Sequence, residues 1–370
     1  MSAHGQRDPL LKSFLRAGWR GTLMAHALAS TVTSGGRNGA PRVFYGGARA
    51  GNVGGPLVNV KRLREFFPEH HWRYNLVYCL SNAPYLPAAA LDWLRWRRVP
   101  VVLNQNGVFY PGWYDGDWKG QNRVMARAYH RADHVFWQSA FCRDAADRFL
   151  GERSGPGEVL YNAVDTRHFR PAGHRPARPF TFLVTGKIGN HLAYRLESTV
   201  AGLGHARNAG LDCCLAVAGW VESGARALLE AAADRHGVAT SIAYLGPYTQ
   251  EKAPAIYQAA DAYVITKYLD PCPNTVLEAL ACGLPVLYSR SGGVPELVGP
   301  EGGVGLPVPE DWSSIHMPDA ATIGEGMLKI AATAPAIAVE ARRRAVDHFD
   351  IEHWIGRHRT VFERLLEYRT

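Results

Sequence analysis

The fold of this chain is decided by residues 270–299, which read DPCPNTVLEALACGLPVLYSRSGGVPELVG. The apolar run before them, DAYVITKYL, is typical of a buried strand, and a Pro-rich turn follows it. A helical pattern begins at Asn274, the expected N-cap, and stops at Gly283, because glycine takes the left-handed position after a helix at low cost. The run PVLYS predicts a second strand, and a Gly-Gly turn then leads into a helix that starts at Pro295. The stretch therefore predicts two successive strand-turn-helix units of a parallel α/β sheet.

Both predicted helices begin at the carboxyl ends of strands, which is where ligands bind in such sheets. The unpaired backbone N–H groups of a helix N-terminus favour an anion such as phosphate. Asp270 and Glu278 stand at the two ends of the first turn, and their carboxylates are suited to accepting hydrogen bonds from hydroxyl groups. The sequence therefore predicts a site for a molecule with phosphate in its middle and hydroxyl groups at both ends. A nucleotide-sugar is such a molecule.

These residues resemble the signature of the retaining glycosyltransferases of family 4. In that signature a Glu, seven residues and a second Glu are followed by a helix, ACG-P-V, a strand and GG-PE. This chain has Asp270 in the place of the first Glu and Glu278 in the place of the second. Three further matches keep the same order and spacing: Ala281-Cys282-Gly283, Pro285-Val286 and Gly292-Gly293-Val294-Pro295-Glu296. The alternative is an ordinary strand-turn-helix of another α/β protein.

The resemblance implies the GT-B fold, an α/β fold in which two Rossmann-like domains face each other across a cleft. It implies an N-terminal acceptor domain over residues 1–168 and a C-terminal donor domain over residues 169–349. Residues 350–370 are expected to form a final helix that crosses back and completes the N-terminal domain. The Pro-rich segment 166–179 is the expected linker, and residues 162–165 are the expected hinge.

The composition is typical of a soluble protein with two domains. The chain has 370 residues, of which 47% are hydrophobic and 20% are charged, and this is enough for two sizeable cores. No apolar run reaches the roughly 18 residues that span a bilayer, and the first residues lack the pattern of a secretory leader. The six cysteines form no pair with metal-ligand spacing and are expected to be reduced. We therefore expect a cytoplasmic protein.

The net charge of +8 favours an anionic partner. No nucleic-acid motif is present, so an anionic membrane or an anionic substrate is expected instead. Residues 8–30 predict an amphipathic helix, with Lys12, Arg16 and Arg20 in a basic stripe at intervals of four residues. The stripe predicts peripheral contact with anionic lipid at the inner membrane face. The alternative, that the helix packs on its domain and leaves the stripe to solvent, remains open.

The resemblance also implies which residues bind the donor diphosphate. Gly54-Gly55 match a Gly-Gly that approaches it, because glycine lets backbone N–H groups come close to a ligand; a plain turn is the alternative. Lys187 matches the first of two cations that clamp the diphosphate. The second cation is displaced in this sequence, and Arg195 is the candidate, with His191 second.

Other donor contacts follow from the same matches. Glu278 would hold the ribose hydroxyls, Asp270 would hold hydroxyls of the transferred sugar, and Tyr248 would stack on the nucleotide base. Backbone N–H groups at the start of the helix would stabilise charge on the leaving diphosphate. The remaining donor-binding residues implied by the resemblance are Asn274, Thr275, Val276, Gly246, Gly292 and Gly293.

The loop FYPGWYDGDWKGQN, residues 109–122, is dense in aromatic residues and follows a predicted strand. Aromatic faces pack well on sugar rings, so Trp113, Tyr114 and Trp118 are candidates for the binding of a carbohydrate or lipid-linked acceptor. The alternative is a loop that packs on itself. Resembling enzymes carry a His near the end of this strand, and here Asn104 or Asn106 holds the place.

Together the matches imply transfer of a sugar from a nucleotide-sugar to an acceptor hydroxyl with retention of configuration. Asp270, Lys187 and Arg195 are the expected catalytic residues, and the leaving phosphate would help to deprotonate the acceptor. No metal, other cofactor or covalent nucleophile is expected. Two alternatives remain: a non-catalytic nucleotide-sugar binding protein of the same fold and, more weakly supported, a nucleic-acid-binding protein that uses the positive charge.

Overall fold

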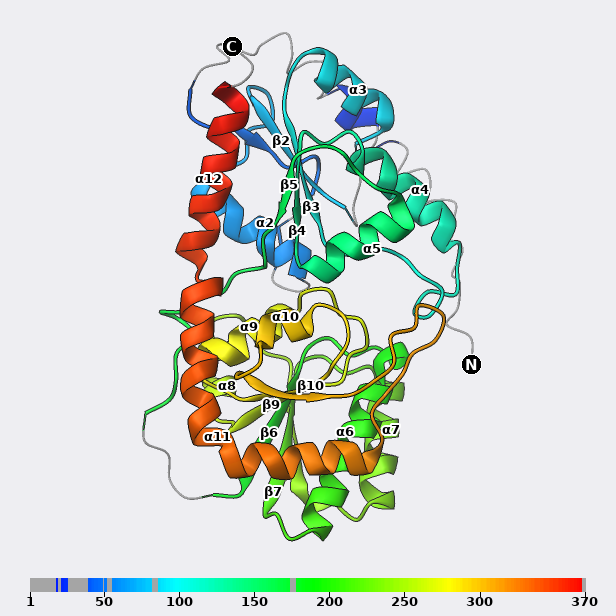
Figure 1. The fold of residues 1–370 in the computed structure, drawn as a ribbon, viewed down its shortest axis with the longest axis vertical. Helices are drawn as coiled ribbons and strands as arrows, with labels where there is room; N and C mark the ends of the chain where they lie inside the picture. Colours follow the sequence, from blue (N-terminus) through cyan, green and yellow to red (C-terminus); the bar gives the residue numbers. More distant parts are fainter. Residues whose placement is uncertain are drawn as a thin grey trace. The chain divides into compact units, whose positions relative to one another are not determined.

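The structure is a computed structural model, and it describes residues 18, 21–25, 39–48, 50–51, 55–81, 86–173 and 178–367. The chain divides into two compact units. Unit 1 consists of Met1–Tyr161, Trp312–Ser314 and Glu352–Thr370, and unit 2 consists of Asn162–Asp311 and Ile315–Ile351. Each unit has its own parallel sheet covered by helices (Figure 1).

The described part of unit 1 is built on a five-stranded sheet with all neighbouring strands parallel. Its strand order is that of the chain, β1-β2-β3-β4-β5, and β2 and β3 are buried at every residue, as expected for a sheet covered on both faces. The strands are β1 (Val43–Phe44), β2 (Leu76–Leu80), β3 (Val101–Gln105), β4 (His134–Trp137) and β5 (Gly157–Val159). The helices are α2 (Gly55–Phe66), α3 (Ala88–Trp96), α4 (Trp118–Tyr129), α5 (Ala140–Leu150) and α12 (Ile351–Glu367).

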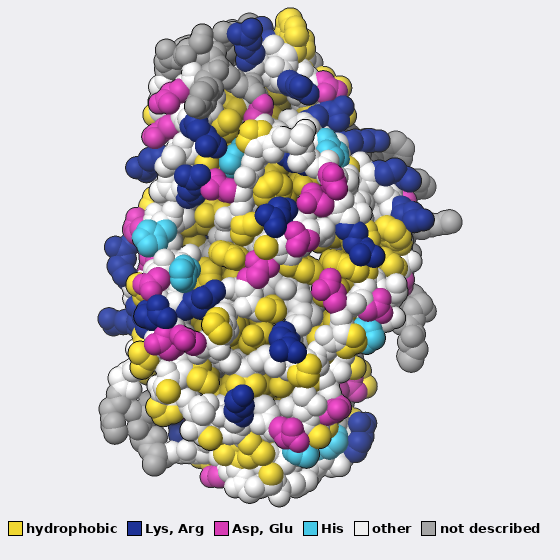
Figure 2. Space-filling model, in the orientation of Figure 1, with side chains coloured by type: hydrophobic (Ala, Val, Ile, Leu, Met, Phe, Trp, Pro, Cys, Tyr) yellow, Lys and Arg dark blue, Asp and Glu magenta, His cyan; other side chains and the backbone are white. Residues whose placement is uncertain are grey.

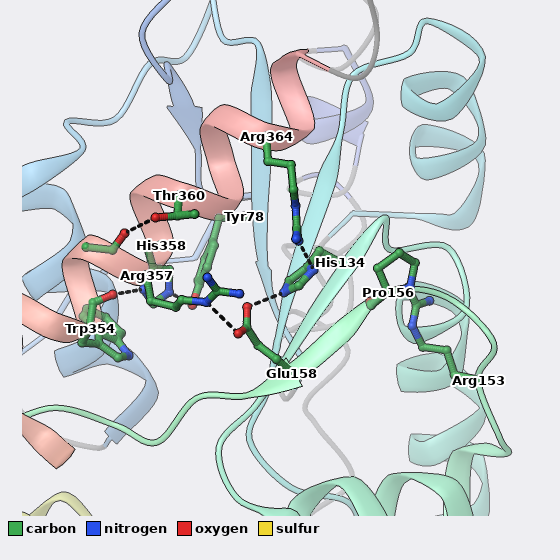
Figure 3. A network of polar contacts seen from close by, with 11 residues as sticks. Tyr78, His134, Arg153, Pro156, Glu158, Trp354, Arg357, His358, Thr360 and Arg364 are labelled. Carbon is green, nitrogen blue, oxygen red and sulfur yellow. Dashed lines mark hydrogen bonds and ion pairs between the residues drawn. The ribbon is translucent and has the colours of Figure 1, made fainter.

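Helix α12 lies against the sheet of unit 1 although all of unit 2 separates them in the sequence. The hydroxyl of Tyr78 on β2 lies 3.2 Å from Nε2 of the buried His358 on α12 (Figure 3). The guanidinium of Arg357 donates to Glu158 on β5 at 2.7 Å. These polar contacts fix the rotation of α12 about its axis, which apolar packing alone specifies weakly.

The described part of unit 2 is built on a six-stranded parallel sheet in the order β11-β10-β9-β6-β7-β8. Its strands are β6 (Phe180–Thr185), β7 (Cys213–Ala218), β8 (Ile242–Gly246), β9 (Ala262–Ile265), β10 (Val286–Ser289) and β11 (Gly303–Leu306). The α-helices are α6 (Tyr194–Asn208), α7 (Ser223–Arg235), α8 (Ala253–Gln258), α9 (Asn274–Ala281), α10 (Val294–Val298) and α11 (Ala320–Phe349), with 3₁₀ turns at Asn190–Leu192 and Ala239–Ser241.

The stretch 270–299 forms the two strand-turn-helix units that the sequence predicts. Strand β9 leads through Asp270 into α9, and β10 leads through the Gly-Gly turn into α10. Gly283 follows α9 with φ at +72°, as expected for a glycine that ends a helix. The carboxyl ends of β9 and β10 therefore lie side by side at one edge of the sheet.

The passage between the units differs from the one expected, because it falls at Tyr161/Asn162 and not after residue 168. The side chain of Asn162 donates to the carbonyl of Cys272 at 2.9 Å, and the N–H of Val164 donates to the carbonyl of Phe349 at 2.9 Å. These bonds hold the expected hinge, residues 162–165, inside unit 2. Their partners lie far away in sequence, so the local pattern did not reveal them.

The predicted amphipathic helix over residues 8–30 falls mostly outside the described residues, and so do Lys12, Arg16 and Arg20. Gly18 and residues 21–25 are helical, and Leu23 is buried. In the part of the chain that the structure describes, no helix combines the length and hydrophobicity needed to cross a membrane.

Candidate active site

Three neighbouring strands of unit 2 end in glycines with positive φ. Gly186 follows β6, Gly219 follows β7 and Gly246 ends β8, with φ at +132°, +115° and +73°. A Cβ on Gly219 would collide with the carbonyl oxygen of Gly186, whereas a Cβ on Gly186 or Gly246 would meet nothing within 4 Å. A glycine is therefore required at position 219, where the ends of β6 and β7 approach each other. The backbone at Gly186 and Gly246 faces open space on the side where a Cβ would stand. The carboxyl edge of the sheet is an accessible backbone surface here.

The turn that carries Asp270 is fastened to the Gly-Gly turn after β10. The N–H of Gly293 donates to the carbonyl of Asp270 at 2.9 Å, and the N–H of Leu269 donates to Oγ of Ser291 at 3.1 Å. A Cβ on Gly292 would lie 2.6 Å from the carbonyl oxygen of Asp270. The Gly-Gly turn thus supports the backbone of Asp270, and the N–H of Gly293 is already occupied.

The carboxylate of Asp270 is held by a lysine that the sequence interpretation missed. Nζ of Lys267 lies 2.7 Å from Oδ2 of Asp270, and the N–H of Cys272 donates to Oδ1 at 3.3 Å. Asp270 is 8% exposed, and the contact with Lys267 fixes the direction of its carboxylate. The only signal in the sequence was the position of Lys267 three residues before Asp270, at the end of the same apolar run.

Arg195 is a buried cation that has no paired anion among the described residues. It stands on the first turn of α6 and is 5% exposed. Its Nε is buried without a hydrogen-bond partner in the described part of the chain, and no carboxylate there forms an ion pair with it. Burial raises the pKa of the Tyr194 hydroxyl, and the positive charges of Arg195 and Lys267 act in the opposite direction. A buried, unpaired guanidinium is strongly unfavourable, so the site favours an anionic ligand.

Lys187 is exposed beside Gly186, and no contact links it to Arg195 among the described residues. Its Nζ lies 5.1 Å from the centroid of the Trp220 ring. His191 lies in the 3₁₀ turn before α6 and is exposed. Of the two candidates for a second cation, Arg195 is therefore the one that the fold buries.

Glu278 lies in a buried polar cluster with tyrosines and a threonine. The hydroxyl of Tyr257 donates to Oε2 of Glu278 at 2.8 Å and lies 3.1 Å from Oγ1 of Thr185. The hydroxyl of Tyr263 lies 3.2 Å from the same Oγ1. Burial raises the pKa of Tyr248, and the charge of Glu278 raises it further, which places the Tyr248 hydroxyl beside this cluster. Through the hydroxyl of Tyr257, the cluster links Glu278 to Thr185, the last residue of β6.

Helix α9 begins without a side-chain cap, so the prediction that Asn274 is the N-cap is wrong. Pro273 takes the N-cap position with extended backbone and no capping hydrogen bond, and Asn274 is the first helical residue. The N–H of Val276 donates to the carbonyl of Pro273 at 3.1 Å. Among the described residues, no hydrogen bond occupies the N–H groups of Asn274 and Thr275. These two groups, rather than that of Val276, are available to an anion.

The candidates Gly54, Gly55 and Asn106 belong to unit 1. Gly54 lies outside the described residues, and Gly55 begins α2. Oδ1 of Asn106 accepts from the hydroxyl of Ser81 at 2.7 Å at the carboxyl end of β3.

The aromatic loop of unit 1 packs on itself and on a residue from a distant segment. Trp113 stacks on Phe109 with 5.3 Å between centroids, and Tyr114 meets Phe109 edge-on. Tyr110 packs edge-on against Trp312, whose carbonyl accepts from the N–H of Gly112 at 2.8 Å. Trp118 is the first residue of α4 and packs on Phe149. Trp113 remains 44% exposed, so of the three aromatic candidates it offers the most surface to a ligand.

No group of His, Cys, Asp and Glu suited to hold a metal ion occurs among the described residues. On the face drawn in Figure 2, Lys and Arg side chains alternate with Asp and Glu and form no continuous stripe. That face therefore lacks the basic track by which proteins follow a nucleic-acid backbone.

Comparisons with known proteins match both halves of the chain. Residues 10–168 match the family described as Glycosyltransferase Family 4, and residues 202–316 match the family described as Glycosyl transferases group 1. The chain is 25% identical over 295 residues to a glycogen synthase of Mycobacterium tuberculosis, covering 78% of this chain and 68% of that protein. It is 35% identical over 108 residues to a D-inositol 3-phosphate glycosyltransferase of Mycobacteroides abscessus, covering 28% of this chain and 23% of that protein.

Solved structures share the fold at low sequence identity. Sucrose-phosphate synthase from Thermosynechococcus elongatus matches with a TM-score of 0.63 at 18% identity, covering 85% of this chain and 78% of that one. Anabaena HepE in complex with UDP and glucose matches with a TM-score of 0.60 at 18% identity, covering 83% and 80%. Two parallel α/β units, the signature at 270–299 and the two family matches lead to one conclusion: the chain belongs to the group 1, family 4-like glycosyltransferases and has the GT-B fold.

Proposed function

We propose that this glycosyltransferase moves a sugar from a nucleotide-sugar donor to an acceptor hydroxyl with retention of configuration, and that unit 2 binds the donor. The observation that carries the proposal is the unpaired, buried Arg195 at the carboxyl edge of the unit 2 sheet. A diphosphate supplies the anion that this cation lacks.

The diphosphate would lie between Arg195 and the start of α9. Arg195 would donate hydrogen bonds to it, and the N–H groups of Asn274 and Thr275 would add the positive end of the helix. Charge grows on the leaving diphosphate during the reaction, so donors that are already in place stabilise the transition state more than the ground state. Lys187 is exposed and would approach the phosphates from the solvent side.

Glu278 and Asp270 would bind the hydroxyl groups at the two ends of the donor. Glu278 would accept hydrogen bonds from the ribose hydroxyls on one side of the diphosphate. Asp270, held by Lys267 at 2.7 Å, would accept from hydroxyls of the transferred sugar on the other side. Asp270 is thereby a positioning and specificity residue, because its carboxylate would contact hydroxyls of the transferred sugar.

The reaction would use no metal, since Arg195 and Lys187 supply positive charge at the diphosphate. It would use no covalent nucleophile: the acceptor hydroxyl attacks the anomeric carbon from the face that the diphosphate leaves. The bond from the anomeric carbon to the diphosphate oxygen breaks, and the hydroxyl proton passes to that oxygen. This route keeps the configuration of the anomeric carbon without a protein base.

UDP-sugars are the first donors to test, because Anabaena HepE was solved with UDP and glucose. Purified protein would be incubated with UDP-, GDP- and ADP-sugars and with panels of carbohydrate and lipid-linked acceptors, and products would be detected by mass spectrometry. We expect one donor to give a product whose anomeric proton, followed by nuclear magnetic resonance, keeps the configuration of the donor.

Calorimetric titration of the same donors would run in parallel. Tight donor binding without any product would mean a non-catalytic binding protein. A product with inverted configuration would refute the proposed front-face route.

A further inference from the structure

The proposed roles leave one prominent residue of unit 2 unused, namely Trp220. It directly follows Gly219 at the carboxyl end of β7 and is 44% exposed. Exposing so much of an indole to water is unfavourable. A ligand that covers the ring would remove this cost.

The backbone at Trp220 is fixed on both sides. The carbonyl of Trp220 accepts from the N–H of Ile188 at 2.8 Å, and the N–H of Gly219 donates to the carbonyl of Gly246 at 2.8 Å. Val221 forms a bridge with Ile188. The indole therefore projects from a rigid position and is ready for a ligand before one arrives.

The order of strands gives the donor a direction along the sheet edge. Neighbouring strands run β10-β9-β6-β7-β8. Asp270, assigned to the sugar, follows β9, and the loop after β6 carries Lys187 and leads to Arg195, both assigned to the diphosphate. A nucleotide-sugar laid along this edge with its sugar at Asp270 brings its base to the ends of β7 and β8. Trp220 lies at that end of the row.

The surroundings of Trp220 suit a flat ligand next to phosphate. Nζ of Lys187 lies 5.1 Å from the centroid of the indole ring, so a cation and an aromatic surface stand together. The Cβ positions of the flanking Gly186 and Gly246 are free of other atoms within 4 Å. Tyr248, expected from the sequence to stack on the base, follows β8 and interacts through its hydroxyl with Thr185 and Tyr257.

We propose that Trp220 is the stacking platform for the nucleobase of the donor, and that Lys187 beside it meets the adjacent phosphate. This inference rests on the proposed function, since it assumes a nucleotide donor. Every base has a flat face, so stacking on Trp220 contributes affinity for nucleotides as a class. Selectivity for one base would come from hydrogen bonds with backbone groups near Gly246.

The test compares a nucleotide with the same anion lacking a base. Calorimetric titration would measure UDP, GDP and ADP, and inorganic pyrophosphate, against wild type, Trp220→Ala and Trp220→Phe. Loss of one stacking contact predicts that Trp220→Ala weakens binding of the preferred nucleoside diphosphate about 5- to 100-fold. Pyrophosphate affinity should stay within about twofold, and Trp220→Phe should retain most nucleotide affinity because it keeps an aromatic face.

Trp96→Ala is the matched control, because Trp96 lies in unit 1, is 68% exposed and has no part in the proposed site; it should not change nucleotide affinity. The inference is overturned if Trp220→Ala binds the nucleotide like wild type, or if it loses pyrophosphate and nucleotide affinity equally. If wild type binds none of the three nucleotides, the proposed function itself fails and this inference falls with it.

Discussion

At the scale of single residues, the proposed donor site contains an aspartate in the place of the longer Glu and a lysine that contacts its carboxylate. Asp270 is one methylene shorter than the Glu of the family signature, so its oxygens reach about 1.2–1.5 Å less far. A hydrogen bond tolerates only a few tenths of an ångström of such a change. Leu269, the residue before Asp270, takes a positive φ of +49°, and the Gly-Gly turn supports the Asp270 backbone. We therefore expect the position of Asp270 to determine which sugar the proposed site accepts.

Replacing Asp270 by Asn should separate binding from turnover. The carboxamide keeps the shape but removes the charge held by Lys267, so most turnover should be lost. Nucleotide affinity should stay within about tenfold, or 1.4 kcal/mol, because the nucleotide does not contact Asp270. Turnover with several donor sugars would be measured for wild type, Asp270→Asn and Asp270→Glu, and Asp270→Glu should change the ranking of donors. Wild-type rate and ranking in Asp270→Asn would show that Asp270 does not touch the sugar.

Glu278→Ala should weaken nucleoside diphosphate binding by about 1–3 kcal/mol, because charged hydrogen bonds to the ribose are lost. Tyr257→Phe is the control: it removes the 2.8 Å bond to Oε2 of Glu278 but leaves the carboxylate in place. Titration calorimetry would compare both variants with wild type. Equal affinity for nucleotide in wild type and a folded Glu278→Ala protein would remove Glu278 from the site.

Local sequence spacing predicted the elements that carry the candidate site. The interval from Asp270 to Glu278 lies on one turn and one helix, and the pattern of residues 270–299 predicted both of these elements. Lys267 and Trp220 carry no motif, and their contacts depend on the arrangement of neighbouring loops. The N-cap prediction for Asn274 failed because Pro273, with φ at −72°, already provides the extended backbone that precedes a helix.

At the scale of elements, α12 depends on a buried histidine. Burial lowers the pKa of His358 to about 4, from an ordinary value of 6.5. The backbone carbonyl of Trp354, 2.8 Å from Nδ1 of His358, and the charge of Glu158 oppose the shift, while His134 adds to it. The fold therefore holds His358 neutral, so that one ring nitrogen donates a hydrogen bond while the other accepts one.

Unit 1 should consequently lose stability as the pH falls from about 6.5 to about 4. Between these pH values His358 binds a proton in the unfolded chain but not in the folded protein. Its contribution to the free energy of unfolding is therefore complete above its ordinary pKa and is lost as the pH falls below it. The shift corresponds to a loss of about 3 kcal/mol at most. Denaturant unfolding of wild type and His358→Gln across this range would measure it. The same slope against pH in both proteins would contradict the assignment.

At this scale, sequence patterns were sufficient wherever an element is defined by its own residues. Apolar runs predicted the buried strands, and the turn at Gly283 predicted the end of α9. The passage between the units was misplaced because Asn162 and Val164 are held by Cys272 and Phe349, which are distant in sequence. Trp312 likewise joins the aromatic loop of unit 1 from a segment with no pattern of its own.

At the scale of the whole molecule, the chain passes from unit 1 to unit 2 at Tyr161/Asn162 and returns at Ile351/Glu352, with a short excursion into unit 1 at Trp312–Ser314. Few residues thus connect two units with separate cores, and such passages absorb rigid-body rotations. Binding of the donor to unit 2 should favour a closed state, which sequesters the reaction from water.

Small-angle scattering should therefore show a smaller radius of gyration at saturating donor than without it. The Arg195→Leu variant is the control, since it should not bind the diphosphate and should keep the larger radius. An unchanged radius for wild type at saturating donor would argue against closure.

The central claim is that the diphosphate of the donor supplies the anion that pairs with the buried Arg195. Thermal unfolding with and without UDP tests this claim most directly. Without ligand, Arg195→Leu should unfold at the same temperature as wild type or higher, because an unpaired buried charge is replaced by an apolar side chain. With UDP, wild type should be stabilised by about 2.7 kcal/mol at a hundred times its dissociation constant. Arg195→Leu should show almost no stabilisation, and Arg235→Leu, which removes an exposed arginine of α7, should respond like wild type. The claim would be contradicted if Arg195→Leu were destabilised without ligand and still stabilised by UDP to the same extent as wild type.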